Sequence, residues 1–310
     1  MPSSEPHPAG RPEVAPEPAD DPRAPVAFVL GGGGVLGAAE IGMAKALAQA
    51  GIRPDLVLGT SIGALNGAFL AADPSVDGVD RLAELWRTLG TSGVFSGSLP
   101  RRIGTLARTR THLHGRGPMR RLFLQHQPAA LIEDLPVHFE CVAASIEQAA
   151  EHWFTEGSLA DAVLASCAVP GLFAPVRIGE EHFYDGGLVH SIPVGRAVAL
   201  GAKTVYVLHV GRIERPLVPP HNPLEVGLVA FEIARRHRFA ADMAALPPEV
   251  TVHVLPSGSE PLSARGELDP RRYRRTDGLG GRIERARAAT ATFLSGTGTN
   301  PGQAAETTVG

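Results

Sequence analysis

The chain has 310 residues, of which 44% are hydrophobic and 20% charged, and its formal net charge at pH 7 is −3. This much apolar material can form a sizeable core, which excludes a fully disordered protein. The small net charge argues against a nucleic-acid binder with a globally basic surface. Two cysteines, Cys141 and Cys167, are too few for a disulfide scaffold or a thiolate zinc site. Both lie among apolar residues, so we expect buried, reduced thiols of a cytoplasmic protein.

The two ends of the chain differ in composition from the middle. Residues 1–25 include eight prolines, and residues 295–310 are mostly small or polar. Segments with so little apolar surface are predicted to be disordered. The first segment lacks the apolar run of a secretory signal, and no stretch reaches the ~18 apolar residues that a membrane span needs. We therefore predict one domain over residues 26–294, with its motifs within about residues 26–198.

Between these ends, short β-rich runs alternate with helical patterns. In chain order, the predicted strands are 26–30, 56–58, 138–144, 204–210 and 250–255. The predicted helices are 37–50, which Gly51 ends, 62–72 and 224–245. This alternation predicts an α/β fold with a mostly parallel sheet that helices cover on both faces.

A glycine run, Gly31-Gly32-Gly33-Gly34-Val35-Leu36-Gly37, joins the first predicted strand to the first helix. Glycines let backbone N–H groups approach a ligand, and a helix N-terminus favours an anion. The run also matches the dinucleotide fingerprint G-x-G-x-x-G, which expects an acidic residue at the end of the next strand. Here that strand ends in Gly59-Thr60-Ser61, and Asp55 lies at its opposite end. The pattern therefore favours an anion hole over a dinucleotide site.

A second motif, Gly59-Thr60-Ser61-Ile62-Gly63, follows a predicted strand and opens a helix. This is the context in which G-x-S-x-G places a nucleophilic serine on a sharp turn. The positive end of the helix would lie where negative charge develops. The alternative is a turn of small residues in which Ser61 only caps the helix.

A third motif, Asp185-Gly186-Gly187, follows the block Ala165–Pro175 (ASCAVPGLFAP). With this block, the chain resembles the patatin-like phospholipase family, whose ordered pattern is G-G-G-x-[RK]-G, G-x-S-x-G, A-S-x-A-x-P-x-x-F-x-P and D-G-[GA]. The chain shows these motifs at Gly32–Gly37, Gly59–Gly63, Ala165–Pro175 and Asp185–Gly187.

The resemblance implies a three-layer α/β/α sandwich and hydrolysis of lipid acyl esters, and we expect phospholipid or lysophospholipid substrates and no cofactor. We also expect no metal, because no cluster in the sequence offers three or four well-spaced ligands. It implies a two-residue dyad of Ser61 as nucleophile and Asp185 as its partner. The oxyanion-hole amides would come from Gly32, Gly33 and Gly34. The glycines expected to support the motifs are Gly37, Gly59, Gly63, Gly186 and Gly187.

One residue departs from the family pattern, and two other functions are alternatives to a Ser-Asp hydrolase. Leu36 stands where the family usually has Arg or Lys, and a cation there would help to fix the loop and stabilise negative charge. A catalytically weak lipid-binding protein on the same fold is therefore one alternative. The other is an α/β-hydrolase with a Ser-Asp-His triad, for which the candidate histidines are His209, His237 and His253.

A stretch without Asp or Glu runs from Leu85 to Ile132. Apolar residues alternate in it with arginines, at positions 87, 101, 102, 108, 110, 116, 120 and 121. This mixture suits peripheral contact with an anionic membrane surface, and the alternative is a solvated, Arg-rich loop. His112 and His114 form an H-x-H pair, but no acidic residue accompanies them, so we expect no metal there.

Overall fold

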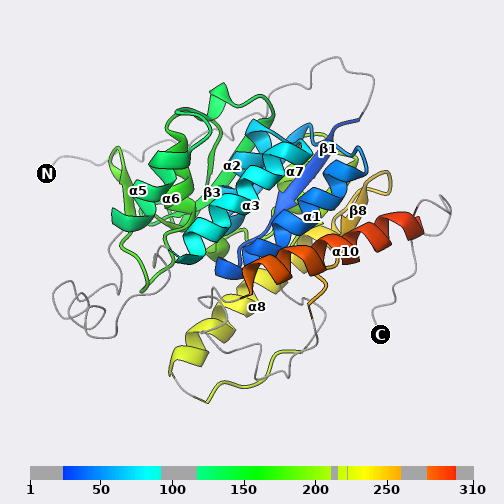
Figure 1. Ribbon diagram of the computed structural model, residues 1–310. Helices are drawn as coiled ribbons and strands as arrows, with labels where there is room; N and C mark the ends of the chain where they lie inside the picture. Colours follow the sequence, from blue (N-terminus) through cyan, green and yellow to red (C-terminus); the bar gives the residue numbers. More distant parts are fainter. Residues whose placement is uncertain (1–23, 92–116, 211–215, 222, 260–277, 298–310) are drawn as a thin grey trace, which may run out of the picture.

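A computed structural model describes residues 24–91, 117–210, 216–221, 223–259 and 278–297. Within these residues the chain forms one eight-stranded sheet with helices on both faces (Figure 1). The strands are β1 Val26–Leu30, β2 Leu56–Thr60, β3 His138–Ser145, β4 Ala150–Phe154, β5 Val176–Ile178, β6 Glu181–Asp185, β7 Thr204–Leu208 and β8 Thr251–Val254.

The α-helices are α1 Ala38–Gln49, α2 Ile62–Ala72, α3 Val76–Thr91, α5 Gly117–His126, α6 Leu159–Ser166, α7 Val194–Ala199, α8 Pro223–Ala244 and α10 Leu279–Thr297. Three short 3-10 turns complete the described elements, η1 Gly34–Gly37, η2 Ile132–Asp134 and η3 Gly186–Leu188. Helix α10 reaches Thr297, three residues into the tail that begins at Ser295 in the sequence prediction. Residues 1–23 and 298–310, the rest of the predicted disordered ends, lie outside the described residues.

The sheet has a parallel part and an antiparallel part. Strands β3, β2, β1, β7 and β8 pair in parallel in that order, as the alternation of strands and helices predicts. Beyond them, β4 and β6 each pair antiparallel with β3, and β5 pairs antiparallel with β6. The antiparallel strands have only three to five residues, and charged residues interrupt their apolar ones, so no β-rich run in the sequence predicted them.

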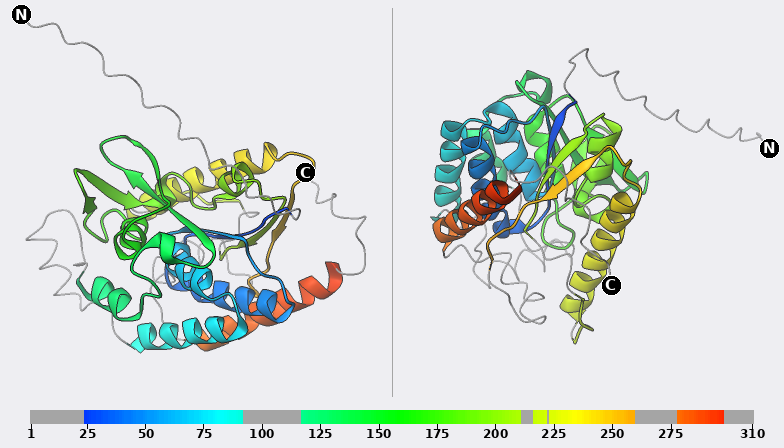
Figure 2. Two further views of the ribbon diagram at one scale, coloured as in Figure 1. Left: turned by 90° about the horizontal axis from the view of Figure 1, so that it is seen from above. Right: turned by 90° about the vertical axis from the view of Figure 1, so that its right-hand side faces the viewer.

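The helices cover the sheet in two layers, which makes the predicted α/β/α sandwich. Figure 2 shows α1, α3 and α10 on one side of the sheet and α8 on the other. The central strand β1 contributes side chains to the apolar cores on both faces of the sheet. Phe28 and Leu30 belong to one core, and Ala27 and Val29 belong to the second. A strand buried on both faces explains why its sequence reads as a continuous apolar run.

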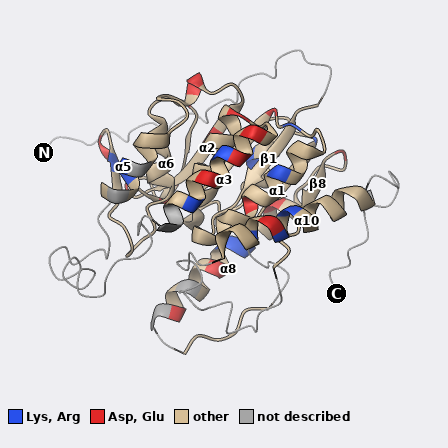
Figure 3. Cartoon of the chain, viewed as in Figure 1, with Lys and Arg blue, Asp and Glu red and all other residues tan. Residues whose placement is uncertain are grey.

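The described helices on the first layer carry charges of both signs on their outer surface (Figure 3). These include ion pairs between Lys45 and Asp80, between Arg81 and Asp73, and between Arg287 and Glu284. All have partly exposed members, so they contribute little to stability and mark this layer as a solvated surface.

Helix α10 packs on α1 through a very close approach. A Cβ atom added to Gly42 of α1 would lie 2.0 Å from the carbonyl oxygen of Ile283 and 3.0 Å from the Cβ of Ala286. Ile283 and Ala286 are both buried. The two backbones therefore touch at Gly42, and a side chain at this position would push α10 away.

We predict that Gly42→Ala lowers the melting temperature, because relieving the overlap with Ile283 costs about 1–3 kcal/mol. Thermal unfolding followed by circular dichroism measures the effect. The matched control is Gly227→Ala in α8, where an added Cβ meets nothing within 4 Å. There the reduced entropy of the unfolded chain should raise stability slightly. An unchanged melting temperature in Gly42→Ala would contradict the close packing.

Candidate active site

Ser61 lies on a sharp turn between β2, which ends at Thr60, and α2, which begins at Ile62. Its backbone has φ 56° and ψ −125°, and for a residue other than glycine such a conformation costs on the order of 1–3 kcal/mol. The Ser61 N–H donates to the Ser166 hydroxyl at 2.8 Å, and that hydroxyl donates to the Val142 carbonyl at 2.6 Å. These two hydrogen bonds tie the strained turn at Ser61 to strand β3 through Ser166.

Gly59 and Gly63 allow that turn to form. A Cβ on Gly59 would lie 2.5 Å from the Cα of Ala64, and one on Gly63 would lie 2.4 Å from the Leu30 carbonyl oxygen. The strand, the turn and the helix thus pack too closely for any side chain at either position. These close contacts account for glycine at both positions.

Strand β3 brings Asp185 to Ser61. Val142 pairs with Thr60 of β2, and the next residue, Ala143, pairs with Asp185 of β6. Ser61 follows Thr60 directly, so the two side chains meet, and the Ser61 hydroxyl donates to Asp185 Oδ2 at 2.6 Å. The two residues are 124 positions apart in sequence, and no imidazole stands between them.

The turn after Asp185 also requires its glycines. The Gly187 N–H donates to Asp185 Oδ1 at 2.8 Å, so both carboxyl oxygens accept a hydrogen bond. A Cβ on Gly186 would lie 2.1 Å from the Val142 carbonyl oxygen, and one on Gly187 would lie 2.5 Å from the ring of Phe231 on α8. Close contacts on both sides therefore fix the position of the carboxyl group.

The Asp185 carboxyl group is buried, with 1% of the residue exposed. No cationic side chain among the described residues forms an ion pair with it. Burial raises the pKa of Asp185 to about 6, and the hydrogen bonds from Ser61 and Gly187 limit the rise. A carboxylate with such a pKa is a much better proton acceptor near neutral pH than an ordinary aspartate.

The glycine run lies against Ser61. A Cβ on Gly32 would be 3.4 Å from the Ser61 Cβ. The N–H of Gly32 donates to the Ser191 carbonyl in a long hydrogen bond of 3.3 Å, which differs from the free oxyanion donor that we predicted. The N–H groups of Gly33 and Gly34 meet no acceptor in the described part of the chain. These two amides remain the candidates for binding an anion beside Ser61.

The end of the run packs on the serine turn. A Cβ on Gly37 would lie 2.7 Å from Cγ2 of Ile62, and the Gly37 carbonyl accepts a hydrogen bond from Asn66 at 3.0 Å. Leu36, which replaces the family's basic residue, is buried in the apolar core. Its side chain therefore adds no charge to the loop.

A match to a family model covers residues 28–198, which is more than half of the chain. The chain belongs to the patatin-like phospholipase family. Among relatives, Lysophospholipase nte1 of Aspergillus terreus and Lysophospholipase NTE1 of Coccidioides immitis are each 32% identical over 197 residues. Each match covers 61% of this chain but only 12% of the relative, so the chain spans a small part of these proteins.

Among solved structures, the chain is similar to VipD from Legionella pneumophila, with 14% sequence identity and a TM-score of 0.45. That alignment covers 89% of this chain and 67% of VipD.

The three histidines of the triad alternative lie just after β7, on α8 and in β8. The first of them, His209, packs against the start of the glycine run, since a Cβ added to Gly31 would lie 2.6 Å from its Nδ1. His209 is buried, and its Nε2 contacts Nη1 of Arg235 at 2.8 Å. Burial and the nearby arginines lower the pKa of His209 well below its usual value. His253 stacks on Tyr206 in the sheet, and His237 lies on the exposed face of α8. Arg235 of the same helix is buried, whereas its neighbours His237 and Arg238 are exposed.

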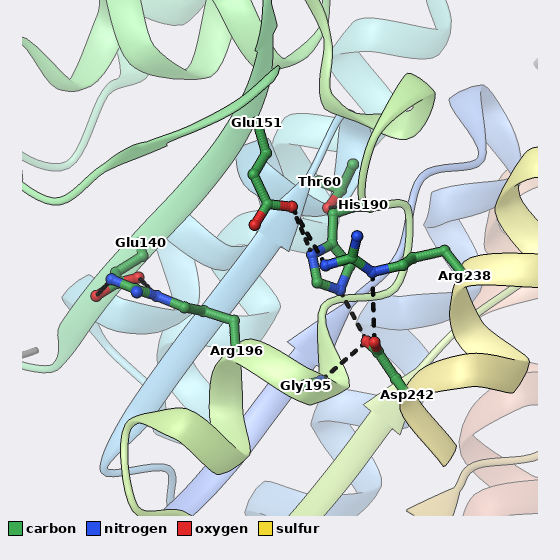
Figure 4. A network of polar contacts seen from close by, with 8 residues as sticks. All are labelled: Thr60, Glu140, Glu151, His190, Gly195, Arg196, Arg238 and Asp242. Carbon is green, nitrogen blue, oxygen red and sulfur yellow. Dashed lines mark hydrogen bonds and ion pairs between the residues drawn. The ribbon is translucent and has the colours of Figure 1, made fainter. Parts of the chain in front are cut away.

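A buried histidine that no sequence motif predicted, His190, follows the Asp185 turn and belongs to a polar cluster (Figure 4). His190 is 3% exposed, and its two ring nitrogens contact Glu151 at 3.2 Å and Asp242 at 2.8 Å. Burial alone would lower the pKa of His190, but the hydrogen bonds to the two carboxylates outweigh it and raise the pKa. Arg238 approaches both carboxylates as well, at 3.5 and 3.4 Å.

This cluster ties the Asp185 turn to its surroundings. The backbone of His190 accepts a hydrogen bond from the Thr60 hydroxyl at 2.8 Å and donates one to the Gly186 carbonyl at 2.8 Å. Its side chain joins β4 and α8 through Glu151 and Asp242 (Figure 4). The proximity of His190 to Asp185 in sequence was a usable signal, but its partners lie 39 and 52 positions away.

A small apolar pocket adjoins the dyad. Its lining includes Cys167 and Ala168, and the Ala168 carbonyl accepts the N–H of Asp185 at 3.0 Å. The rest of the lining is Met119, Leu164 and Phe173. Both cysteines are buried, as expected, and burial raises the pKa of the Cys167 thiol well above its usual value. The thiol therefore acts as an apolar wall.

The predicted membrane-contact stretch is described only at its ends. Arg101, Arg102, Arg108, Arg110, Arg116 and the His112–His114 pair lie outside the described residues. Of the rest, Arg120 and Arg121 are exposed on α5, whereas Leu85 and Phe123 are buried in the core. No helix in the described ranges combines the length and apolar character needed to cross a bilayer. Nor do these ranges hold a group of three or more His, Cys, Asp or Glu side chains placed to bind a metal ion.

We predict that Asp185→Asn raises the melting temperature at pH 8 by a few degrees. The pKa of Asp185 is raised from 3.8 to about 6 on folding, so the folded state binds this proton more tightly than the unfolded state does. The resulting cost to stability is absent below about pH 4, grows up to about pH 6, and is complete above it. The neutral amide avoids that cost.

Melting curves of both proteins between pH 4 and pH 8 measure this difference, which should vanish at the acid end. The matched control is Asp77→Asn, an exposed aspartate in the first turn of α3. It should give no gain at pH 8, because its charge is solvated and favours the helix N-terminus. If Asp185→Asn melts below the wild type at pH 8, the ionised Asp185 carboxyl group does not destabilise the folded protein, which would contradict the prediction.

Proposed function

We propose that the chain is a serine acyl-ester hydrolase acting on phospholipid or lysophospholipid esters through Ser61 and Asp185. The observation that carries the proposal is the 2.6 Å hydrogen bond from the Ser61 hydroxyl to a buried carboxyl group. Membership of the patatin-like phospholipase family and the relatives named lysophospholipase support the substrate class.

In the first half of the reaction, the Ser61 oxygen attacks the ester carbonyl carbon while Asp185 accepts the hydroxyl proton. The carbonyl oxygen becomes an oxyanion, which accepts hydrogen bonds from the N–H groups of Gly33 and Gly34. When the tetrahedral intermediate collapses, the ester C–O bond breaks. Asp185 then returns the proton to the departing alcohol, which for a lysophospholipid carries the head group.

In the second half, a water molecule attacks the acyl-serine ester. Asp185 accepts a proton from the water, the same two amides stabilise the second oxyanion, and the proton passes to the Ser61 oxygen as the fatty acid leaves. One carboxyl group thus acts as base and acid in turn. Its pKa near 6 suits both roles, because neither protonation state is strongly disfavoured near neutral pH.

The apolar pocket beside the dyad supports an acyl substrate. Cys167 and Ala168 bring its wall next to Ser61 and Asp185, and Met119, Leu164 and Phe173 extend it with apolar side chains. A hydrocarbon chain gains free energy by leaving water for such a surface. We propose that the first carbons of the acyl chain bind here while the carbonyl faces the glycine loop.

We predict that Ser61→Ala and Asp185→Asn each lower kcat/KM for a p-nitrophenyl ester by at least about a thousandfold. The first change removes the nucleophile, and the second removes the base. Initial rates on the ester, and fatty-acid release from lysophosphatidylcholine, measure the loss. A fluorophosphonate probe should label the wild type at Ser61 and leave Ser61→Ala unlabelled.

The control for this experiment is His253→Gln, since His253 lies in β8 and contacts neither Ser61 nor Asp185. It should keep kcat/KM within about threefold of the wild type. A folded His209→Gln variant that lost activity by several orders of magnitude would favour the triad instead. Turnover by Ser61→Ala at the wild-type rate would rule out Ser61 as the nucleophile.

We predict that kcat/KM rises with pH through an apparent pKa of about 6 and then levels off. The carboxylate must be ionised to accept the Ser61 proton, and the pKa of Asp185 is about 6. A neutral ester keeps the substrate from titrating, and circular dichroism defines the pH range in which the protein is folded. A rate that is flat between pH 5 and pH 7 within that range would contradict Asp185 as the base.

A further inference from the structure

An arginine far along the chain contacts the glycine loop. Arg282 of α10 donates from Nη1 to the Val35 carbonyl at 2.9 Å, across 247 positions of sequence. Val35 belongs to η1, the 3-10 turn that follows Gly33. Arg282 lies well outside residues 28–198, the segment that matches the family model.

The packing of α10 fixes where this guanidinium lies. Gly42 of α1 lets α10 approach so closely that Ile283, the neighbour of Arg282, meets the α1 backbone. Figure 1 shows α10 running alongside α1, with the start of both helices at the same end of the layer. The loop enters α1 at that end, since η1 ends at Gly37 and α1 begins at Ala38. Arg282 is therefore held beside the loop by a rigid helix pair.

The contact continues through two peptide groups to the proposed oxyanion hole. The Val35 carbonyl, which accepts from Arg282, shares its peptide group with the Leu36 N–H. That N–H donates to the Gly33 carbonyl at 3.1 Å. The Gly33 carbonyl in turn shares its peptide group with the Gly34 N–H. No cis peptide occurs in the described chain, so each N–H points away from the carbonyl of its own peptide group.

We propose that Arg282 is a positioning residue for the oxyanion hole, acting on the Gly34 N–H through the Val35–Leu36 and Gly33–Gly34 peptide groups. A charged donor makes a stronger hydrogen bond than a neutral one. A chain of hydrogen bonds also polarises each member, which makes the last N–H a better donor. The proposal rests on the proposed function, because it assigns the Gly34 N–H to an oxyanion.

This role supplies from α10 the positive charge that the loop itself lacks, since Leu36 is apolar and buried. The other end of the loop is held separately, by the hydrogen bond from Asn66 to the Gly37 carbonyl. Asn66 is fixed in turn by the Trp86 indole at 2.8 Å and by Glu40 at 2.8 Å. Arg282 is thus the charged member of the set of donors that fix the carbonyls of this loop.

The test replaces Arg282 by Gln, which removes the charge, and by Lys, which keeps it. We expect Arg282→Gln to lower kcat for a p-nitrophenyl ester by about tenfold to a hundredfold and to change KM by less than about threefold. This loss is smaller than the 10²–10³ of deleting an oxyanion donor outright. Arg282→Lys should recover part of the lost kcat. The matched control is Arg285→Gln, an exposed arginine of the same helix, which should keep the wild-type kcat and KM.

A second measurement separates positioning from a general structural effect. A trifluoromethyl ketone forms a tetrahedral oxyanion adduct with a nucleophilic serine, whereas the corresponding methyl amide binds as a neutral ground-state analogue. Arg282→Gln should weaken the ketone by the same factor as kcat/KM and leave the amide unchanged. Equal weakening of both ligands, or wild-type kcat in a folded Arg282→Gln variant, would overturn the proposal.

Failure of the proposed function and failure of the Arg282 role give different results. Fluorophosphonate labelling and hydrolysis by the wild type test the proposed function first, and their failure would remove that function. A wild type that is active beside an equally active Arg282→Gln variant would overturn the role of Arg282 alone.

Discussion

The site depends on the pairing register of one strand. At Val142 and Ala143, β3 exchanges a parallel neighbour, β2, for an antiparallel one, β6. Through this exchange the C-terminal ends of β2 and β6 meet at neighbouring residues of β3, which is why a serine and an aspartate 124 positions apart share a hydrogen bond. Because side chains alternate between faces, a slip of one residue in either pairing would turn one of the two groups to the wrong face.

Charged side chains are distributed unevenly around Ser61 and Asp185. The Asp185 carboxyl group is buried beside Ser61 with only neutral hydrogen-bond donors, so its pKa rises and it can exchange a proton near neutral pH. The charges behind it, those of His190, Glu151, Asp242 and Arg238, bind one another instead. Although burial opposes these shifts, hydrogen bonds within this cluster raise the pKa of His190 and lower the pKa values of Glu151 and Asp242. The His190 backbone holds the Asp185 turn, while the Asp185 carboxyl group forms no ion pair with the cluster.

The sequence predicted the parts of the structure that rest on local patterns. The strand 26–30 and the helix 62–72 match β1 and α2, and the predicted strand 56–58 is two residues shorter than β2. Close backbone contacts explain Gly59, Gly63 and Gly186, which the motifs singled out. The strand predicted at 204–210 ends at Leu208 instead, where the Leu208 carbonyl accepts the N–H of Gly31 and pairing with β1 stops.

What the sequence did not predict comes from contacts between distant segments. The antiparallel strands are short and polar, and the hydrogen bond between Gly32 and Ser191 depends on a turn 159 positions further along the chain. The same holds for the Arg282 contact with Val35, which joins α10 to a loop near the other end of the domain. No periodicity or motif within either segment reveals such a partner, since the partner is set by how the helices pack.

The reach of α10 back to the glycine loop has a consequence during protein synthesis. The loop, the serine turn and the aspartate turn all leave the ribosome before Leu279, and chains begin to fold from their N-terminal part as they emerge. Gly42, however, has no α10 to pack on until that helix has been synthesised. A nascent chain can thus hold every motif of its family and still lack the guanidinium at Val35. With Arg282 in its proposed role, the proposed hydrolase would reach full activity only after α10 has been synthesised.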